Sequence, residues 1–121
     1  MLFRSASRSE NADAPFLTLA TMEWFQAHYL PDPDDCLDPR VSPLLASDLA
    51  GLPPALVVTA EFDPLRDEGE AYAAALRDAG VEAALHRYDG MPHLFFQLGA
   101  VTDAGRELLA EAAEALRKAL G

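Results

Sequence analysis

The apolar positions along the chain repeat with two different periods, which predict alternating helices and strands. In residues 18–30 they recur at spacings of three and four, as on one face of a helix, and the prolines that follow cannot continue it. Residues 55–60 (ALVVTA) form a short, continuous and partly β-branched apolar run, which suits a parallel strand buried on both faces. The expected helix face consists of Met22, Phe25 and Tyr29.

The rest of the chain predicts two more helices and a second strand. Residues 67–79 begin with carboxylates, which favours a helix N-terminus, and Gly80 closes this helix. Residues 81–90 predict a strand, and residues 103–120 predict a last helix. The expected buried sides are Tyr72, Leu76 and Ala79 in the first of these helices, and Leu109, Ala113, Leu116 and Leu120 in the last.

The predicted order of helix, strand, helix, strand, helix defines the fold class as α/β, built on a βαβ unit with two parallel strands. We expect three parts along the chain. Residues 1–15 are a polar N-terminal loop, residues 16–52 a helical segment and connection, and residues 53–121 the α/β core unit.

Charge and cysteine content exclude several classes of function. The 121 residues carry a formal net charge of -11, which repels phosphate backbones, so no nucleic acid partner is expected. No run approaches the roughly 18 apolar residues that span a bilayer, so no membrane span is expected. The single cysteine, Cys36, excludes an internal disulfide and favours a cytoplasmic location. We expect no metal site and no cofactor.

The ends of the two predicted strands carry a carboxylate and an imidazole. Asp63 follows the first strand and His93 the second, and the carboxyl ends of neighbouring parallel strands meet at one edge of a sheet. Asp63 would then hold one ring nitrogen of His93 and leave the other free as a base. Both residues also have a structural interpretation, because Asp before Pro commonly forms turns and a histidine in a loop is usually solvated.

Residues 52–95 carry motifs that resemble the C-terminal part of the hormone-sensitive lipase-like (fold-3) α/β-hydrolases. The upstream segments at residues 16–30 and 38–54 also resemble the part of that family that precedes the acid strand and contributes to a lid. The resemblance therefore covers nearly the whole chain except its first dozen residues. The matching motifs are the Pro53-Pro54 entry to a strand, the DPLRD run at residues 63–67 with Gly69 and Tyr72 behind it, Ala79-Gly80-Val81, and the loop at residues 88–93.

This resemblance implies that Asp63 is the triad acid and His93 the triad base of a serine esterase acting on small-molecule esters. The family's chain order, nucleophile then acid then histidine, agrees with acid before histidine here. The resemblance also implies a lid-like role for residues 16–52 and an apolar substrate site lined by Trp24, Phe25 and Phe95. One departure is Leu94, which stands directly after the histidine where the family usually has glycine.

The family's serine nucleophile is not among these residues. None of the seven glycines belongs to a G-x-S-x-G elbow, and no HGGG-type oxyanion loop is present. We therefore expect the C-terminal portion of an α/β-hydrolase fold with an incomplete sheet, inactive by itself, whose partner is a second copy or a complementing chain.

Two other hypotheses stay open at this point. The first is a non-catalytic or split-protein interaction module that pairs through an exposed sheet edge. The second is half of a flavodoxin-like or response-regulator-like sheet, in which Asp63 would bind magnesium or accept phosphate. The second hypothesis lacks a further acidic cluster and a suitably placed lysine, because Lys118 is the only lysine.

Overall fold

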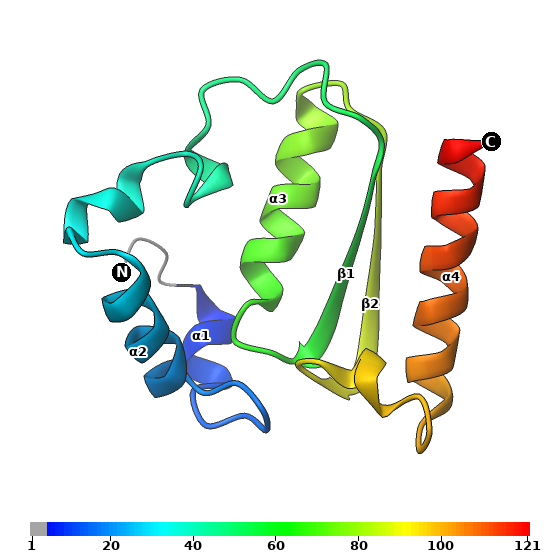
Figure 1. Ribbon diagram of the computed structural model, residues 1–121, viewed down its shortest axis with the longest axis horizontal. Helices are drawn as coiled ribbons and strands as arrows, with labels where there is room; N and C mark the ends of the chain where they lie inside the picture. Colours follow the sequence, from blue (N-terminus) through cyan, green and yellow to red (C-terminus); the bar gives the residue numbers. More distant parts are fainter. Residues whose placement is uncertain (1–4) are drawn as a thin grey trace.

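Two parallel strands lie between helices in the computed structural model of the chain, which describes residues 5–121 (Figure 1). In chain order, the elements are α1 (Ala6–Glu10), α2 (Leu19–Tyr29), the short 3-10 helices η1 (Pro33–Leu37) and η2 (Pro43–Leu45), β1 (Ala55–Phe62), α3 (Arg66–Asp78), β2 (Ala83–Pro92), the 3-10 helix η3 (Phe95–Leu98) and α4 (Asp103–Leu120). Helices α3 and α4 lie on opposite sides of the strands, and α2, η1 and η2 lie beyond α3 (Figure 1). The predicted α/β class is confirmed.

The two strands pair in parallel, with a bulge near their carboxyl ends. Pairing is in register over residues 55–60 of β1 and resumes at Phe62, and between these points Glu61 faces three residues of β2. Gly90 lies in this bulge with a φ of 77°, and its N–H donates to Glu61 Oε2 over 2.6 Å. Because a bulge bends its strand, it redirects the chain shortly before His93.

Helix α3 packs on the strands through a narrower face than the sequence predicted. Leu76 is buried as expected, but Tyr72 and Ala79 are only half-buried, and Ala73 is fully buried instead. Gly80 closes the helix as predicted, with a φ of 79° that favours glycine. The buried face is therefore centred between Ala73 and Leu76, and Tyr72 borders a cavity on the other side of the helix.

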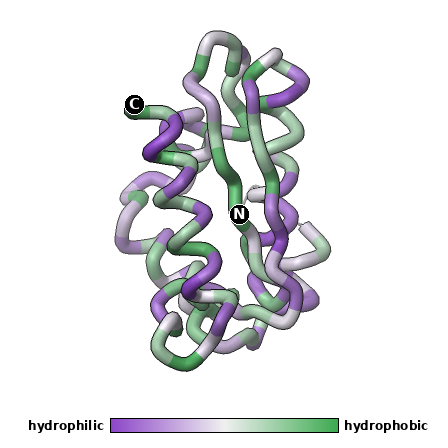
Figure 2. The backbone as a smooth tube through the Cα atoms, turned by 90° about the vertical axis from the view of Figure 1, so that its right-hand side faces the viewer, coloured by the Kyte–Doolittle hydropathy of each residue, from purple (hydrophilic) through white to green (hydrophobic). Residues whose placement is uncertain are grey.

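Helix α4 forms as predicted, but the predicted buried stripe is wrong. The side chains of that stripe are all exposed: Leu109, Ala113, Leu116 and Leu120. The helix instead packs on the core through Ala104 and Leu108. Its apolar residues form two neighbouring stripes at helical spacing, and periodicity alone cannot decide which of them faces the sheet. Figure 2, viewed from the α4 side, shows hydrophobic and hydrophilic residues mixed along this helix.

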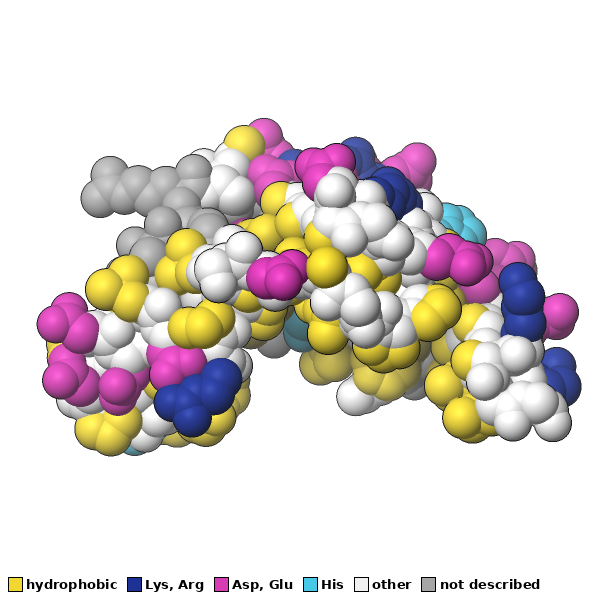
Figure 3. Space-filling model, turned by 90° about the horizontal axis from the view of Figure 1, so that it is seen from above, with side chains coloured by type: hydrophobic (Ala, Val, Ile, Leu, Met, Phe, Trp, Pro, Cys, Tyr) yellow, Lys and Arg dark blue, Asp and Glu magenta, His cyan; other side chains and the backbone are white. Residues whose placement is uncertain are grey.

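The core is small, and β1 is less buried than predicted. Its buried centre consists of Ala60, Tyr88 and Phe95. We expected β1 to be buried on both faces, yet residues 55–58 are only half-buried. The physical reason is that, within residues 5–121, β1 has a neighbouring strand on one edge only. Seen from above, the molecule is arched, and hydrophobic side chains lie along its hollow side (Figure 3).

The prediction of a loop over residues 1–15 is wrong for Ala6–Glu10, which forms α1. Residues 1–4 of that expected loop lie outside the described residues. Polar, small residues gave no local helix signal, and the helix is held by contacts distant in sequence. Ser7 is fully buried and hydrogen-bonded to Asp67 at the start of α3.

Helix α2 forms as predicted, with Thr18 as its N-cap, but it buries none of its side chains. The aromatic side chains of its predicted apolar face are largely exposed, with Phe25 at 57% and Tyr29 at 78%. Apolar residues at helical spacing thus predicted the helix, but within the described residues none of its side chains is buried. None of the helices in residues 5–121 is long and apolar enough to cross a membrane.

One ion pair ties α3 to β2. Arg87 donates two hydrogen bonds to the Glu70 carboxylate, over 2.7 and 2.6 Å, and Thr59 donates a third over 3.2 Å. The hydrogen bonds from Arg87 hold the pKa of Glu70 below its usual value of 4.5, against the opposing effect of burial. Glu70 therefore stabilises the fold in its charged form.

We expect Glu70→Gln to reduce the dependence of stability on acid. A lowered folded-state pKa means that the contribution of Glu70 is complete above its unfolded pKa and is lost as pH falls through the folded value. Because both partners are partly exposed, the variant should lose no more than about 1 kcal/mol at neutral pH. Urea unfolding at several pH values should show this difference shrink towards pH 3, and Glu114→Gln serves as an exposed control. A difference that stays constant with pH would contradict the prediction.

The isolated chain is expected to be marginally stable or to associate with itself. The open edge of β1 and the exposed apolar side chains leave surface that favours contact with another chain. Sedimentation velocity and thermal unfolding over a wide range of protein concentration test this. A monomer with a sharp, concentration-independent unfolding transition would be incompatible with it.

Candidate active site

Asp63 lies at the carboxyl end of β1, in the turn that leads into α3. It is only 8% exposed, and its Oδ1 accepts a hydrogen bond from the Leu65 N–H over 2.8 Å. The carbonyl of Asp63 also accepts from the Arg66 N–H over 3.1 Å, which closes the turn. Pro64 is fully buried in this turn and has a restricted φ angle. One carboxylate oxygen thus shapes the turn, and the other remains available.

The available oxygen of Asp63 meets His93, which directly follows β2. His93 Nδ1 lies 2.7 Å from Asp63 Oδ2, although the two residues are 30 positions apart in sequence. An ionised carboxylate only accepts hydrogen bonds, so the geometry requires Nδ1 to carry the proton. Nε2 is then the nitrogen with a free lone pair. The arrangement is able to accept a proton at Nε2 and to stabilise the resulting imidazolium from the opposite side of the ring.

Leu94 turns the chain immediately after His93. Its φ of 62° and ψ of 14° are left-handed, a conformation that costs roughly 1–2 kcal/mol for a residue with a side chain. The sequence departs from the family pattern at this residue, and the backbone here has the geometry that glycine adopts most easily. The departure does not keep His93 from its hydrogen bond with Asp63.

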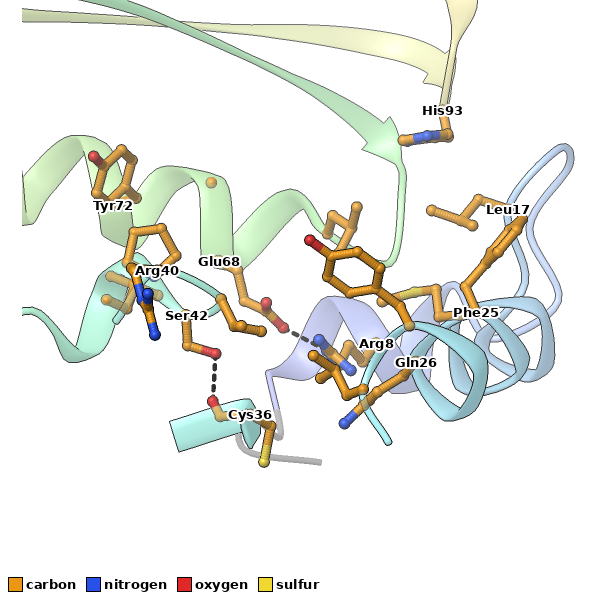
Figure 4. Close-up of a pocket in the computed structure, with 18 residues that line it drawn as sticks. Arg8, Leu17, Phe25, Gln26, Cys36, Arg40, Ser42, Glu68, Tyr72 and His93 are labelled. Carbon is orange, nitrogen blue, oxygen red and sulfur yellow. Dashed lines mark hydrogen bonds and ion pairs between the residues drawn. The ribbon is translucent and has the colours of Figure 1, made fainter. Parts of the chain in front are cut away.

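A cavity of about 910 Å³ opens beside His93, between α3 and the segment that contains α2, η1 and η2. Leu17 and Phe25 lie on the side of His93, and Tyr72 and Arg40 lie on the opposite side (Figure 4). Between them, Arg8 and Glu68 form an ion pair in the cavity wall (Figure 4). The imidazole of His93 therefore borders a space with a mainly apolar wall on one side.

Of the three side chains expected at an apolar substrate site, the structure brings one to this cavity. Phe25 lines it together with His93. Trp24 does not line it but packs against Phe25 with ring centroids 5.2 Å apart and against His28. Phe95 is 4% exposed and packs in the core against Tyr88, with ring centroids 4.9 Å apart. The left-handed turn before Phe95 directs it onto the sheet and away from the cavity.

Several cavity residues were missed by sequence reasoning. Met22 lies on the helix face that the sequence predicted, one turn before Phe25, but it was not assigned to the substrate site. Arg8 and Glu68 carry no such signal, because their contact joins segments 60 residues apart. Within residues 5–121, no three or more His, Cys, Asp or Glu side chains are grouped so that they could hold a metal ion.

Comparisons with known proteins identify the family. Residues 2–97 match the family model described as the alpha/beta hydrolase fold. The carboxylic ester hydrolase LipN of Mycobacterium tuberculosis is 50% identical over 103 residues, which cover 82% of this chain and 27% of LipN. The ethyl acetate hydrolase of Pseudomonas putida is 43% identical, with coverage of 86% and 33%.

A solved structure agrees with these relatives. The carboxylesterase EstE1, cloned from a metagenomic library, superposes with a TM-score of 0.91 at 48% identity over 97% of this chain and 40% of EstE1. The chain thus belongs to the α/β-hydrolase family, in its hormone-sensitive lipase-like (fold-3) group. It spans about a third of the length of the curated relatives it matches.

We expect Leu94→Gly and Leu94→Ala to separate backbone strain from lost side-chain contacts. Both variants remove the leucine contacts, but only glycine relieves the left-handed strain, so Leu94→Gly should be more stable than Leu94→Ala by about 0.5–1 kcal/mol. Chemical denaturation of both variants in parallel measures this difference. If Leu94→Ala is at least as stable as Leu94→Gly, the left-handed backbone at residue 94 carries no strain and the prediction is wrong.

Proposed function

We propose that this chain supplies the acid and the base of a serine carboxylic ester hydrolase. Asp63 is the acid and His93 the base, and the 2.7 Å hydrogen bond between Oδ2 and Nδ1 is the observation that carries the proposal. The serine nucleophile and the oxyanion hole come from residues outside these 121, because the 121 residues contain neither motif. The names of the relatives LipN and EstE1 support ester hydrolysis as the reaction class.

In this mechanism, Nε2 of His93 removes the proton from the serine hydroxyl while the oxygen attacks the ester carbonyl carbon. The C=O double bond opens to an oxyanion, and the tetrahedral intermediate collapses as His93 returns the proton to the leaving alcohol. Water then attacks the acyl-enzyme in the same way and releases the acid. In both steps Asp63 stabilises the imidazolium and keeps the ring oriented.

The substrate class is a small-molecule ester whose apolar part contacts the cavity beside His93. Phe25 supports this assignment, because its ring lines the same cavity as the imidazole. The Arg8–Glu68 ion pair gives the wall a polar point that is partly shielded from solvent, with side-chain exposures of 14% and 18%. Residues 16–52 would cover this space as a lid-like segment.

A second candidate function rests on the open edge of β1. Within the described residues, β1 pairs only with β2, and exposed strand edges bind further strands. The chain would then act as a non-catalytic module that binds another chain by adding its strand to the sheet. The Asp63–His93 pair has no role in this alternative. Substitution of either residue would therefore abolish ester hydrolysis in the first candidate but leave strand binding unchanged in the second.

The esterase proposal is tested by a chimera in which these 121 residues replace the matching segment of EstE1. We expect the chimera to hydrolyse short-chain nitrophenyl esters and the 121-residue chain alone to show no burst. His93→Ala in the chimera should lower kcat by about a thousandfold or more, since a triad base is removed. Asp63→Asn should also lower kcat strongly, because it no longer favours the correct tautomer.

His28→Ala is the matched control in the chimera, because His28 is an exposed histidine on α2 whose ring contacts the Trp24 carbonyl. Its turnover should equal that of the unmodified chimera. Turnover that survives His93→Ala would overturn the assignment of the base. Burst kinetics from the chain alone would overturn the absence of a nucleophile.

A further inference from the structure

Ser7 is a polar residue in an unexpected place. It lies in α1, is fully buried, and makes contact with the turn that carries Asp63, more than 50 residues away in sequence. A buried hydroxyl without a partner costs about 1–3 kcal/mol, so its partners explain why it is tolerated there. The hydroxyl donates to the Pro64 carbonyl over 2.9 Å, accepts from the Asp67 N–H over 3.2 Å, and lies 3.2 Å from the Ser5 hydroxyl.

The backbone of Ser7 adds a further contact. Its N–H donates to Asp67 Oδ2 over 2.7 Å. Burial acts to raise the pKa of Asp67, but the Ser7 N–H and the Arg66 guanidinium outweigh it, and the pKa is lowered. Asp67 therefore accepts this bond as an ionised carboxylate, which makes it stronger than a neutral one. Ser7 thus binds both ends of the turn between β1 and α3.

This turn sets the position of the carboxylate of Asp63. Pro64 follows Asp63 directly and has little freedom in φ, so a shift of the Pro64 carbonyl moves Asp63 with it. Asn11 of the same N-terminal segment donates to the Asp63 carbonyl over 3.4 Å. The turn is therefore held from outside, by residues that touch neither His93 nor the cavity space beside it.

Two ion pairs flank Ser7 but are less suited to this task. Arg8 pairs with Glu68, and Glu10 pairs with Arg66, so three positions of α1 contact the first turn of α3. Glu10 is 57% exposed, and a solvated ion pair fixes geometry weakly. The Arg8–Glu68 pair is better shielded, but Glu68 lies within α3, beyond the Pro64–Asp67 turn. Ser7 is the contact that combines full burial with hydrogen bonds to the turn itself.

We propose that Ser7 is a positioning residue, which holds the Pro64–Asp67 turn so that Asp63 Oδ2 stays within hydrogen-bond distance of His93. A catalytic group tolerates only about 0.5 Å of displacement before its geometry is lost. Removal of the hydroxyl leaves the Pro64 carbonyl and the Asp67 N–H without this partner, and the turn relaxes. The inference deepens the proposed esterase function and rests on it for its catalytic meaning.

Nuclear magnetic resonance of the ¹⁵N-labelled chain tests the proposal without any turnover. The Nδ1 proton of His93 exchanges slowly with water while Asp63 accepts it, and Asp63→Asn identifies its resonance by loss or shift. In Ser7→Ala we expect its exchange to accelerate about tenfold relative to the amide protons of β1, the effect of losing one hydrogen bond. Comparison with β1 amides removes any contribution from global unfolding.

Ser9→Ala is the matched control, because Ser9 lies in the same helix, is exposed, and hydrogen-bonds only within it, to the Ala6 carbonyl. Its His93 proton should exchange as in the unmodified chain. If Ser7→Ala does not fold, Ser7→Cys replaces it, since a thiol is similar in size but a weaker donor. The proposal is overturned if, in a folded Ser7 variant, exchange of the His93 Nδ1 proton accelerates no more than exchange of the β1 amides does, each compared with the unmodified chain.

The EstE1 chimera separates this inference from the proposed function. Ser7→Ala in the chimera should lower kcat with little change in KM, because the cavity wall that contacts substrate is unaltered. An unmodified chimera without turnover would overturn the esterase proposal. The exchange measurement would still decide whether Ser7 holds Asp63 in place.

Discussion

The contact between Asp63 and His93 depends on one constraint, the parallel pairing of β1 and β2. Parallel strands end at the same edge of a sheet, so residues that follow two neighbouring strands meet there although a helix separates them in sequence. In an antiparallel pair, the residues that follow the two strands would lie at opposite ends of the sheet. The crossover helix α3 makes the parallel arrangement possible. The Asp63 turn, the bulge in β2 and the cavity all lie near the carboxyl ends of the two strands.

Local backbone geometry then sets the exact positions of Asp63 and His93. On β1, the Asp63 side chain closes a turn with one oxygen and faces His93 with the other. On β2, a bulge held by Glu61 bends the strand, and left-handed Leu94 turns the chain back towards the core. Of these features, the left-handed conformation of Leu94 carries an energetic cost, and such local departures from regular structure are typical of functional sites.

Outside the site, much of the molecule is poorly buried. The core is small, β1 is half-buried over residues 55–58, and α2 buries none of its side chains. The chain spans about a third of the length of its curated relatives. In the proposed function, these exposed surfaces would contact the residues that supply the nucleophile and the oxyanion hole.

The sequence by itself determined the secondary structure of the core unit and the two residues at the strand ends. Periodicity, helix caps and strand-ending turns are local, so β1, α3, β2 and α4 were predicted within a few residues. The motif around Asp63 and His93 was local as well, and the sequence alone was enough to indicate the family.

Only the tertiary structure decided which segments of the chain pack against one another. The stripe of α4 that faces the sheet, the place of Phe95 in the core and the formation of α1 all depend on contacts between distant segments. Ser7 is the clearest case, because its polar surroundings in sequence predict a solvated loop and its partners lie about 60 positions later. A hydrogen bond between remote segments leaves no periodic trace in either, so only the folded chain reveals it.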